Sequence, residues 1–335
     1  MSWKARRIAQ AIFTIWAVMT LSFVLIRYMP GGPMDFVVGQ LSAQHADLTQ
    51  DEIYALAELY VNINPDAPLH VAYRDYMVAF LQLDLGQSVW YGRPVSEILG
   101  YALPWTILIM ASALFVYFLI GVAMGGIMAY WEGSKTDISL SSLSTIVASI
   151  PFYITALVLL MLFAFRTSYF PAGGRYPSGI QPGLHTDFLF GVAHHATLPV
   201  LSMILAGFGG VALAMRGNSI QVLGEDFVRV ARLRGLSDRR IGLRYVARNA
   251  ILPLYTGLLI AIGSAFGGSV ILEEIFVYPG VGFYMLQAVN ARDYMLMMGA
   301  FTIITIAVVI ALIIADLSYS LLDPRVENEG DREVF

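Results

Sequence analysis

Long apolar segments alternate with polar ones along the chain, and their lengths give the first prediction. A helix needs about 20 predominantly apolar residues to cross a hydrocarbon core about 30 Å thick. Six segments meet this length, and they run approximately over residues 8–28, 105–130, 138–165, 197–215, 251–272 and 297–322. Because the backbone of a bilayer-spanning segment must satisfy its own hydrogen bonds, each segment is predicted to be a helix.

The long polar segment 31–100, between the first two spans, carries helix signals of its own. Thr49 and Glu52 form a capping box ahead of apolar residues at helical spacing. A second helix is expected after Pro68, with Val71, Tyr76, Phe80 and Leu83 along it. Three roles stay open for this lobe: a cap on a pore mouth, a contact for an external partner, or a folded loop without a specific contact.

Glycine and proline interrupt several of the apolar segments. Segment 166–195 is rich in both residues and is expected to be an irregular loop. Proline removes a backbone donor and bends a helix, and small residues four apart let helices approach closely. The sequence has Pro151 and Pro199 within expected spans and the glycine pairs 121/125 and 263/267. Both gating and ordinary packing explain these residues.

Composition places the chain in the membrane. Hydrophobic residues make up 58% of the sequence and charged residues 13%, whereas about a quarter of the residues in an average soluble domain are charged. The segment that begins near residue 8 is too long for the apolar part of a signal peptide and lacks a following cleavage site, so we interpret it as a retained span. Most of the 20 lysines and arginines then fall on one side, which predicts that both termini are cytoplasmic.

A basic segment, residues 216–250, lies between the fourth and fifth expected spans. Its pattern predicts a short amphipathic helix from about Glu225, with Glu225 and Asp226 in the first turn and Gly235 at its end. Ser237 is expected to cap a further helix that runs through Arg248. A basic amphipathic helix of this kind either docks a soluble partner or lies on anionic lipid headgroups.

The last loop on the outer side is the other candidate site. Glu273, Glu274 and Asp293 bracket it, and the stretch between them is too apolar for free exposure to solvent. We interpret the loop as a re-entrant structure at a pore mouth, with static packing as the alternative.

Several kinds of chemistry are missing from the sequence. Cysteine is absent, and no phosphate-binding G-x-x-x-x-G-K-[ST] motif occurs, although residues 133–136 imitate its end. No G-x-S-x-G nucleophile turn is present, and the adjacent His194 and His195 cannot share one helical face. The chain is therefore not expected to be an enzyme or to bind a metal. Charged residues near the span ends, such as Arg216 and Asp316, are expected to snorkel or to form simple ion pairs.

The motifs taken together resemble the oligopeptide and dipeptide permease family of ABC importers. The segment 225–253 is similar to the cytoplasmic "EAA" loop of these permeases. Further similar stretches are residues 27–31, 84–88, 93–95, 103–106, 149–152, 170–174, 273–282, 292–294 and 323–325. Two positions depart from the family pattern: Arg229 stands where other importers have the glutamate that names the loop, and Gly32 stands where aspartate is frequent.

The resemblance implies an all-α, six-helix permease of the type I ABC-importer fold. Residues 1–335 would form one membrane domain, with an extracytoplasmic insertion at 31–100 and an ATPase-coupling loop at 216–250. The resemblance assigns the coupling role to residues of the basic segment: Glu225, Asp226, Phe227, Arg229, Arg232, Gly235 and Ser237. It assigns the loop at the pore mouth to a second set: Glu273, Phe276, Tyr278, Pro279 and Gly280.

The same resemblance implies a division of labour within an inner-membrane complex. The expected partners are a second homologous permease, two cytoplasmic ATPases, an extracytoplasmic substrate-binding protein and membrane lipid, and no nucleic acid. ATP and Mg²⁺ would bind the ATPases, so no cofactor is expected on this chain. Di- or oligopeptides are the expected substrates, with oligosaccharides and nickel complexes as alternatives. An ion-coupled transporter that works alone and a membrane scaffold are the competing functions.

Overall fold

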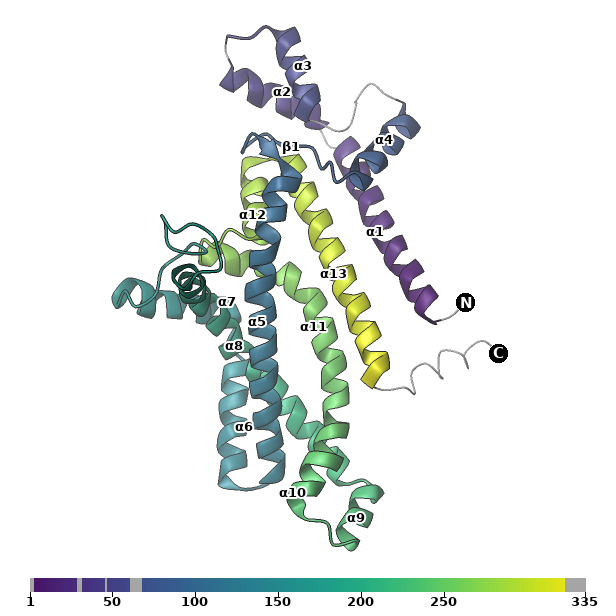
Figure 1. Ribbon diagram of the computed structural model, residues 1–335, viewed down its shortest axis with the longest axis vertical. Helices are drawn as coiled ribbons and strands as arrows, with labels where there is room; N and C mark the ends of the chain where they lie inside the picture. Colours follow the sequence, from purple (N-terminus) through teal and green to yellow (C-terminus); the bar gives the residue numbers. More distant parts are fainter. Residues whose placement is uncertain (1–2, 29–31, 46, 61–67, 323–335) are drawn as a thin grey trace. The chain divides into compact units, whose positions relative to one another are not determined.

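The computed structural model describes residues 3–28, 32–45, 47–60 and 68–322 (Figure 1). The chain forms two compact units. The first contains residues 1–106 and 279–335, and the second contains residues 107–278. The described elements are almost entirely helical, as the apolar pattern predicts.

The first unit combines the N-terminal and C-terminal helices of the chain. Its elements are α1 (Trp3–Arg27), α2 (Gly32–Gln44), α3 (Gln50–Tyr60), α4 (Leu69–Leu81), the strands β1 (Gln87–Ser88) and β2 (Arg93–Pro94), the start of α5 (Val95–Tyr130), α12 (Val281–Ala291) and α13 (Tyr294–Leu322). Helix α1 packs against α13, and α12 also packs against α13. The two strands pair antiparallel, with Ser88 opposite Arg93.

The lobe at 31–100 contains both helices expected there. Glu52 accepts hydrogen bonds from the backbone N–H and the hydroxyl of Thr49, each at 2.8 Å, and the Thr49 hydroxyl accepts from the N–H of Glu52. The capping box at the start of α3 is therefore confirmed. Helix α4 follows Pro68 as expected, but it ends at Leu81, and Leu83 lies beyond it with a positive φ of 59°. Helix α2 was not expected from the pattern.

The second unit is built around one long helix. Its elements are the remainder of α5, then α6 (Lys135–Ala148), α7 (Phe152–Leu159), the π-helix η1 (Leu160–Arg166), α8 (Thr186–Leu223), α9 (Asp226–Leu233), α10 (Asp238–Ile241), the π-helix η2 (Gly242–Val246) and α11 (Ala247–Ile275). Helix α8 packs against α6, α7 and α11. Helices α10, η2 and α11 follow one another without a break, so the helix expected from Ser237 towards the fifth span is confirmed.

Four helices in the described part are long and apolar enough to cross a membrane: α1, α5, α8 and α13. A fifth span arises if α6 and the α7–η1 segment are counted together. Helix α11 covers the position of the expected fifth span, 251–272, and part of it lies outside the residues whose side chains are described. The multi-pass character is confirmed, and the count of six stays a prediction.

The helix expected over 138–165, with a bend at Pro151, is instead broken there into two helices. Helices α6 and α7 are separated by residues 149–151 and are bent by 89°. Pro151 has no backbone N–H and disfavours helical geometry at Ile150, so the helix ends before it and a new one starts after it. Pro199 is different, because α8 continues through it.

Two further boundaries differ from the expectation. Helix α5 begins at Val95, about ten residues before the apolar segment, because the helix extends beyond the part that is apolar enough to be recognised. The loop expected over 166–195 is irregular only as far as His185, which is the N-cap of α8 and accepts a hydrogen bond from the N–H of Phe188 at 3.3 Å.

Two glycines expected to allow close helix approach do so. A Cβ added to Gly121 would meet Val211 of α8 at 2.5 Å, and one added to Gly125 would meet Met215 at the same distance. Any side chain there would force α5 and α8 apart. The pair 263/267 lies outside the described side chains.

Candidate functional site

The basic segment 216–250 contains the end of α8, then α9, α10 and η2, and the start of α11. Helix α9 begins after Glu225, whose extended backbone makes it the N-cap without a side-chain cap bond. Val228 and Ala231 are buried and pack against Ile241 of α10 and Val246 of η2. One face of α9 is therefore fixed to the helices that follow it.

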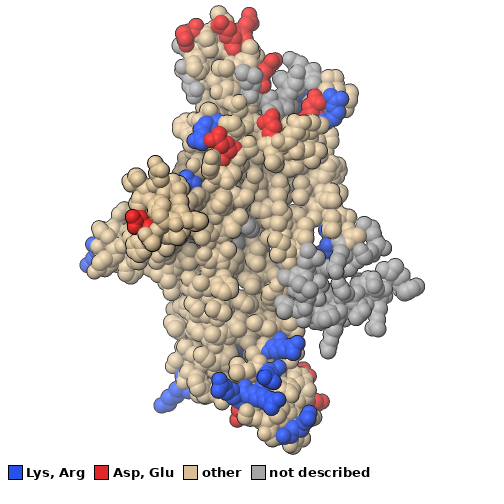
Figure 2. Space-filling view, in the orientation of Figure 1, with Lys and Arg blue, Asp and Glu red and all other residues tan. Residues whose placement is uncertain are grey.

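The opposite face of α9 carries apolar side chains in the open. Phe227 is 43% exposed, Val230 52% and Leu233 83%, and the three residues are spaced at i, i+3 and i+6. We call these three residues the α9 stripe. Exposed arginines flank it at positions 229, 232 and 234, and Figure 2 shows basic side chains gathered where α9 and α10 lie. The only acid paired with them in the described part is Asp226, which lies 3.9 Å from Arg229.

The end of α9 has a defined geometry that depends on glycine. Gly235 has a φ of +72°, in the left-handed region that strains other residues. The N–H of Gly235 donates to the carbonyl of Arg232 at 2.9 Å, and the N–H of Leu236 donates to Ala231 at 3.3 Å. These two bonds form a Schellman motif. The prediction that Gly235 ends the helix is confirmed.

Ser237 lies at the N-cap of α10, as predicted, but its side chain makes no capping bond. The expectation of a side-chain cap is therefore wrong. The turn is instead held by the backbone, because the carbonyl of Ser237 accepts from the N–H of Ile241 at 3.0 Å. The far side of the segment is closed by Asn218 of α8, whose side-chain amide donates to the carbonyl of Ala250 at 3.1 Å.

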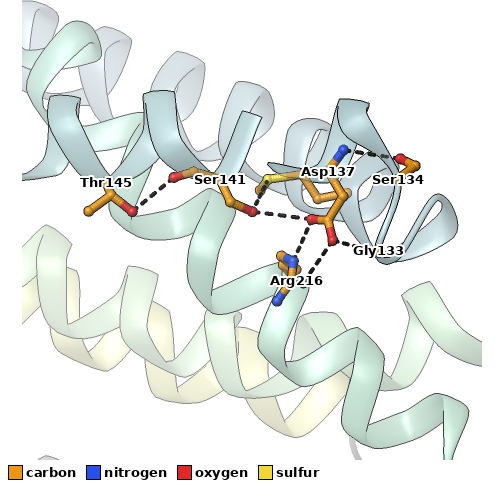
Figure 3. A network of polar contacts seen from close by, with 7 residues as sticks. Gly133, Ser134, Asp137, Ser141, Thr145 and Arg216 are labelled. Atoms are coloured by element: carbon orange, nitrogen blue, oxygen red, sulfur yellow. Dashed lines mark hydrogen bonds and ion pairs between the residues drawn. The ribbon is translucent and has the colours of Figure 1, made fainter. Parts of the chain in front are cut away.

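An ion pair with a buried carboxylate links α6 to α8 at the start of this segment (Figure 3). Arg216 donates from Nε to one Asp137 carboxylate oxygen at 2.6 Å and from a terminal nitrogen to the other at 2.8 Å. Of the two alternatives expected for Arg216, snorkelling or an ion pair, the structure has the ion pair. Its partner Asp137 was not among the predicted site residues, although its position three residues after Ser134 marks the first turn of a capped helix.

Residues 133–136, which imitate the end of a phosphate-binding motif, lie at the turn that starts α6. Gly133 has a φ of +73° in the turn between α5 and α6. Ser134 is the N-cap of α6, and its hydroxyl accepts from the N–H of Asp137. The stretch 133–136 thus forms a helix cap.

The loop after α11 is apolar and closely packed within the second unit. Phe276 is 2% exposed, and both Glu273 and Tyr278 are fully buried. Burial raises the pKa of the Tyr278 phenol, and the Glu273 carboxylate raises it further. Two of the predicted residues, Pro279 and Gly280, belong to the first unit, where Gly280 is the N-cap of α12.

Two stretches that carry the family resemblance meet at this loop. The N–H of Gly174 donates to the carbonyl of Val277 at 3.1 Å. A Cβ on Gly173 would lie 2.8 Å from the carbonyl oxygen of Phe276, so only glycine fits there. Segments 170–174 and 273–278 therefore form one packed structure, which the sequence did not indicate.

A second meeting of such stretches lies in the first unit. Asp293 is 1% exposed, and its carboxylate accepts from the Ser88 hydroxyl at 2.6 Å and from the Trp90 N–H at 3.1 Å. The other carboxylate oxygen accepts from the N–H of Leu296 in the first turn of α13. We call this cluster the Asp293 corner. It joins the β1–β2 hairpin to the helix pair α12–α13.

Thr106 supports the start of α12 in the same unit. Its buried hydroxyl accepts a hydrogen bond from the N–H of Val281 at 2.9 Å. This bond satisfies one of the free donors at the N-terminus of α12.

Histidines do not gather with other ligands in the described part of the chain, where no group of three or more His, Asp or Glu side chains is placed to hold a metal ion. His194 bonds to the carbonyl of Tyr169 at 2.9 Å, and His195 bonds to the carbonyl of Gly191 at 2.8 Å. Both histidines therefore have backbone partners.

Comparison with known proteins gives a match over most of the chain. Residues 121–328 match the family described as binding-protein-dependent transport system inner membrane component. The matched range includes the Asp137–Arg216 pair, the α9 stripe and the loop after α11.

Individual relatives extend the similarity to nearly the whole length. The oligopeptide transport system permease protein AppB of Bacillus subtilis is 33% identical, over 96% of this chain and 98% of the relative. The dipeptide transport system permease protein DppB of the same organism is 29% identical, over 94% of each chain. The probable D,D-dipeptide transport system permease protein DdpB of Escherichia coli is 28% identical, over 95% of each.

Proposed function

Because the chain belongs to the family of binding-protein-dependent transport system inner membrane components, we propose that it is a transmembrane pore subunit of an ATP-driven peptide importer. The observation that carries the proposal is the α9 stripe, an apolar surface left open on a helix whose other face is packed. Two relatives of the chain are named as oligopeptide and dipeptide permeases, and these names support peptides as the substrate class.

The proposed membrane arrangement has six spans with both termini in the cytoplasm. Four described helices meet the length and composition of a span, the bent α6–α7 pair adds one, and we assign α11 as the remaining span. The basic segment then lies on the cytoplasmic side, in line with the bias of lysine and arginine. The lobe at 31–100 lies outside the membrane, where we propose that it caps the pore mouth or meets the binding protein.

The proposed complex divides transport between several chains. We assign ATP and Mg²⁺ to two separate ATPase subunits, since the sequence of this chain has no phosphate-binding loop motif. A second homologous permease completes the pore, a substrate-binding protein delivers the peptide, and lipid surrounds the spans. Under this proposal the chain binds no cofactor of its own.

Coupling is proposed to run through α9. Full burial of a Phe or Leu side chain is worth about 1.5–3 kcal/mol, so covering the α9 stripe with an ATPase groove gives a stable joint. The flanking arginines orient the helix by pairing with acids on the groove rim. ATP shifts the equilibrium between two conformations of the complex only if it binds them with different affinity. We propose that the contact at α9 transmits the resulting movement of the ATPases to α8 and α11.

The loop after α11 is proposed to shape the outer mouth of the pore. Glu273, Phe276 and Tyr278 are too deeply buried to meet a peptide in this conformation. We assign them the task of holding the loop and its partner segment 170–174 in place. Pro279 and Gly280 then lead the chain into α12.

The test is purification of the chain from its native membrane, followed by identification of the chains that accompany it. ATP hydrolysis is then measured with and without the binding protein. We expect a second permease and ATPases, with hydrolysis stimulated by the loaded binding protein. A chain that purifies alone and moves solute down an ion gradient contradicts the proposal.

A further inference from the structure

Asp137 has more polar contacts than any simple ion pair requires. Its side chain is 3% exposed. One carboxylate oxygen accepts from Arg216 Nε at 2.6 Å and from the Ser141 hydroxyl at 3.2 Å. The other accepts from an Arg216 terminal nitrogen at 2.8 Å and from the N–H of Gly133 at 2.9 Å. Both oxygens are therefore fully used.

These contacts join three parts of the second unit at one point. Gly133 belongs to the turn between α5 and α6, Ser141 belongs to α6, and Arg216 belongs to α8 (Figure 3). Arg216 lies about two helical turns before the end of α8, which leads directly into α9. The Asp137 carboxylate thus links the α5–α6 turn to the part of α8 that leads into α9.

Close helix contacts surround the pair. The Ser141 hydroxyl oxygen also lies 3.4 Å from the Met128 sulfur of α5. On α8, a Cβ on Gly209 would collide with the carbonyl oxygen of Ser144 in α6, and the glycine at position 125 brings α5 against α8. The hydrophobic effect is non-directional, so apolar burial by itself does not set one orientation of two helices. A guanidinium and a carboxylate joined by two parallel bonds fix both distance and orientation.

We propose that Asp137 and Arg216 are positioning residues, which hold the end of α8 to the α5–α6 turn so that displacement of α9 moves α5, α6 and α8 together. The inference rests on the proposed importer function and adds the route by which motion leaves α9. Without the pair, α9 and the end of α8 move while α5 and α6 lag behind, and ATP is hydrolysed without transport.

If Asp137 and Arg216 only stabilised the fold, a different result would be expected. Replacing both partners of an ion pair with apolar residues of similar volume is often neutral or stabilising, whereas removal of Arg216 alone leaves the charge of the buried Asp137 uncompensated. The double variant D137L/R216M therefore separates the two roles. A stabilising role predicts normal transport in this variant, and a positioning role predicts stable but uncoupled complexes.

The first readout is the number of ATP molecules hydrolysed per peptide transported. The variant is produced in the complete complex, reconstituted in liposomes with the binding protein and a defined mixture of di- to pentapeptides. We expect this number to rise about two- to thirtyfold, the range for coupling networks in proteins. A number equal to that of the parent complex overturns the proposal.

The second readout is the distance between α6 and the last turn of α8. The chain has no cysteine, so Leu143→Cys and Gln221→Cys, both at exposed positions, carry the only spin labels on this chain. The complex without these two cysteines, treated with the same reagent, measures the labelling of its other subunits. In the parent complex we expect one narrow distance distribution, the same with and without ATP. In D137L/R216M we expect a broad distribution that changes with ATP. Equal distributions in both proteins overturn the proposal.

Arg216→Lys provides a second variant in case the double replacement does not assemble. Lysine keeps the charge beside the buried carboxylate but cannot form the two parallel bonds. We expect a folded complex with a smaller rise in ATP per peptide, and parental coupling in this variant overturns the proposal. The matched control is Lys135→Met, which removes an exposed charge from the first turn of α6, leaves the Asp137–Arg216 pair in place and is expected to leave coupling unchanged.

The same experiments distinguish this inference from the proposed function. If the parent chain does not copurify with ATPases, or its complex shows no hydrolysis stimulated by the binding protein, the importer function itself fails. If the parent complex is active and the variants show the same ATP use per peptide as the parent, the importer function stands and the positioning role is wrong.

Discussion

The α9 stripe and the loop after α11 are both apolar segments next to helix ends, yet the structure treats them in opposite ways. Leu233 of the stripe is 83% exposed, whereas Tyr278 of the loop is fully buried. An apolar side chain in the open is stabilised only by a partner, while a buried one is already satisfied within the chain. The stripe is therefore an apolar face that this chain leaves open, which we propose as a contact surface, whereas the loop is already packed within the chain.

Tyr278→Ala is expected to have the largest effect on stability. It leaves a cavity in the packed loop and is predicted to lower the free energy of unfolding by about 3–5 kcal/mol, as large-to-small changes of aromatic residues do. Thermal unfolding of the purified chain in detergent measures the effect. Val277→Ala is the control, because Val277 is 55% exposed and little stability is expected to be lost. A stable Tyr278→Ala protein that has lost only transport would make the loop a direct contact surface.

Asp293→Ala tests whether the corner in the first unit is also an internal support. The change removes the acceptor for three hydrogen bonds and leaves the buried Ser88 hydroxyl and the Leu296 N–H without that partner. A buried polar group left unsatisfied costs about 1–3 kcal/mol. We expect a lower unfolding temperature and faster proteolysis at the β1–β2 hairpin. Parental stability together with impaired binding-protein stimulation would instead place this corner in a contact surface.

Phe227→Ala is expected to act on assembly and to leave the fold intact. Phe227 is 43% exposed, and surface substitutions usually change stability by less than about 0.5 kcal/mol. Loss of an aromatic anchor from an interface costs about 2 kcal/mol or more, which weakens association by about thirtyfold. Titration of the purified chain with the ATPase subunit measures this loss. Arg232→Ala is expected to weaken association less than Phe227→Ala does, and this loss is expected to shrink as the salt concentration rises, because salt screens the charge that the substitution removes.

Thr49→Ala is expected to give the smallest effect. The two hydrogen bonds from Thr49 lower the pKa of the Glu52 carboxyl below its ordinary value of 4.5. A lowered pKa in the folded state means that the stabilisation is complete above the ordinary pKa and is lost as pH falls through the lowered one. We therefore expect a slightly lower unfolding temperature near pH 7 and a smaller difference in strong acid, where the charge on Glu52 is gone and only the bond from the Glu52 N–H to the Thr49 hydroxyl is lost. A difference that does not shrink as pH falls contradicts the capping-box explanation.

Local patterns predicted the elements whose causes lie within a few residues. The capping box at Thr49, the helix end at Gly235 and the helix start after Pro68 each depend on neighbours in sequence, and each is confirmed. The break at Pro151 was expected only as a bend, because a proline indicates a disturbance but not its angle. Tertiary contacts decide whether the helix continues, as at Pro199, or stops.

Long-range pairs could not be predicted in the same way. Asp137 and Arg216 are 79 residues apart, and Ser88 and Asp293 are 205 residues apart. No periodicity or spacing rule connects positions at such a distance. The stretches with Ser88 and Asp293 were recognised separately through the family resemblance. Arg216 was noted only as a charge near the end of a span, and Asp137 was not singled out. Only the fold brings the members of each pair together.

The central claim is that the α9 stripe contacts the ATPase subunits, and the exposure of its side chains can be measured directly. Leu233→Cys introduces a cysteine into a chain that otherwise has none, and its reaction with a maleimide reports its exposure. We predict rapid labelling in the chain alone and strong protection in the complex with the ATPase subunits. A cysteine at Leu184, which is 96% exposed, should react in both and serves as the reference. Equal labelling of Leu233→Cys in both states would show that the α9 stripe is not the ATPase contact.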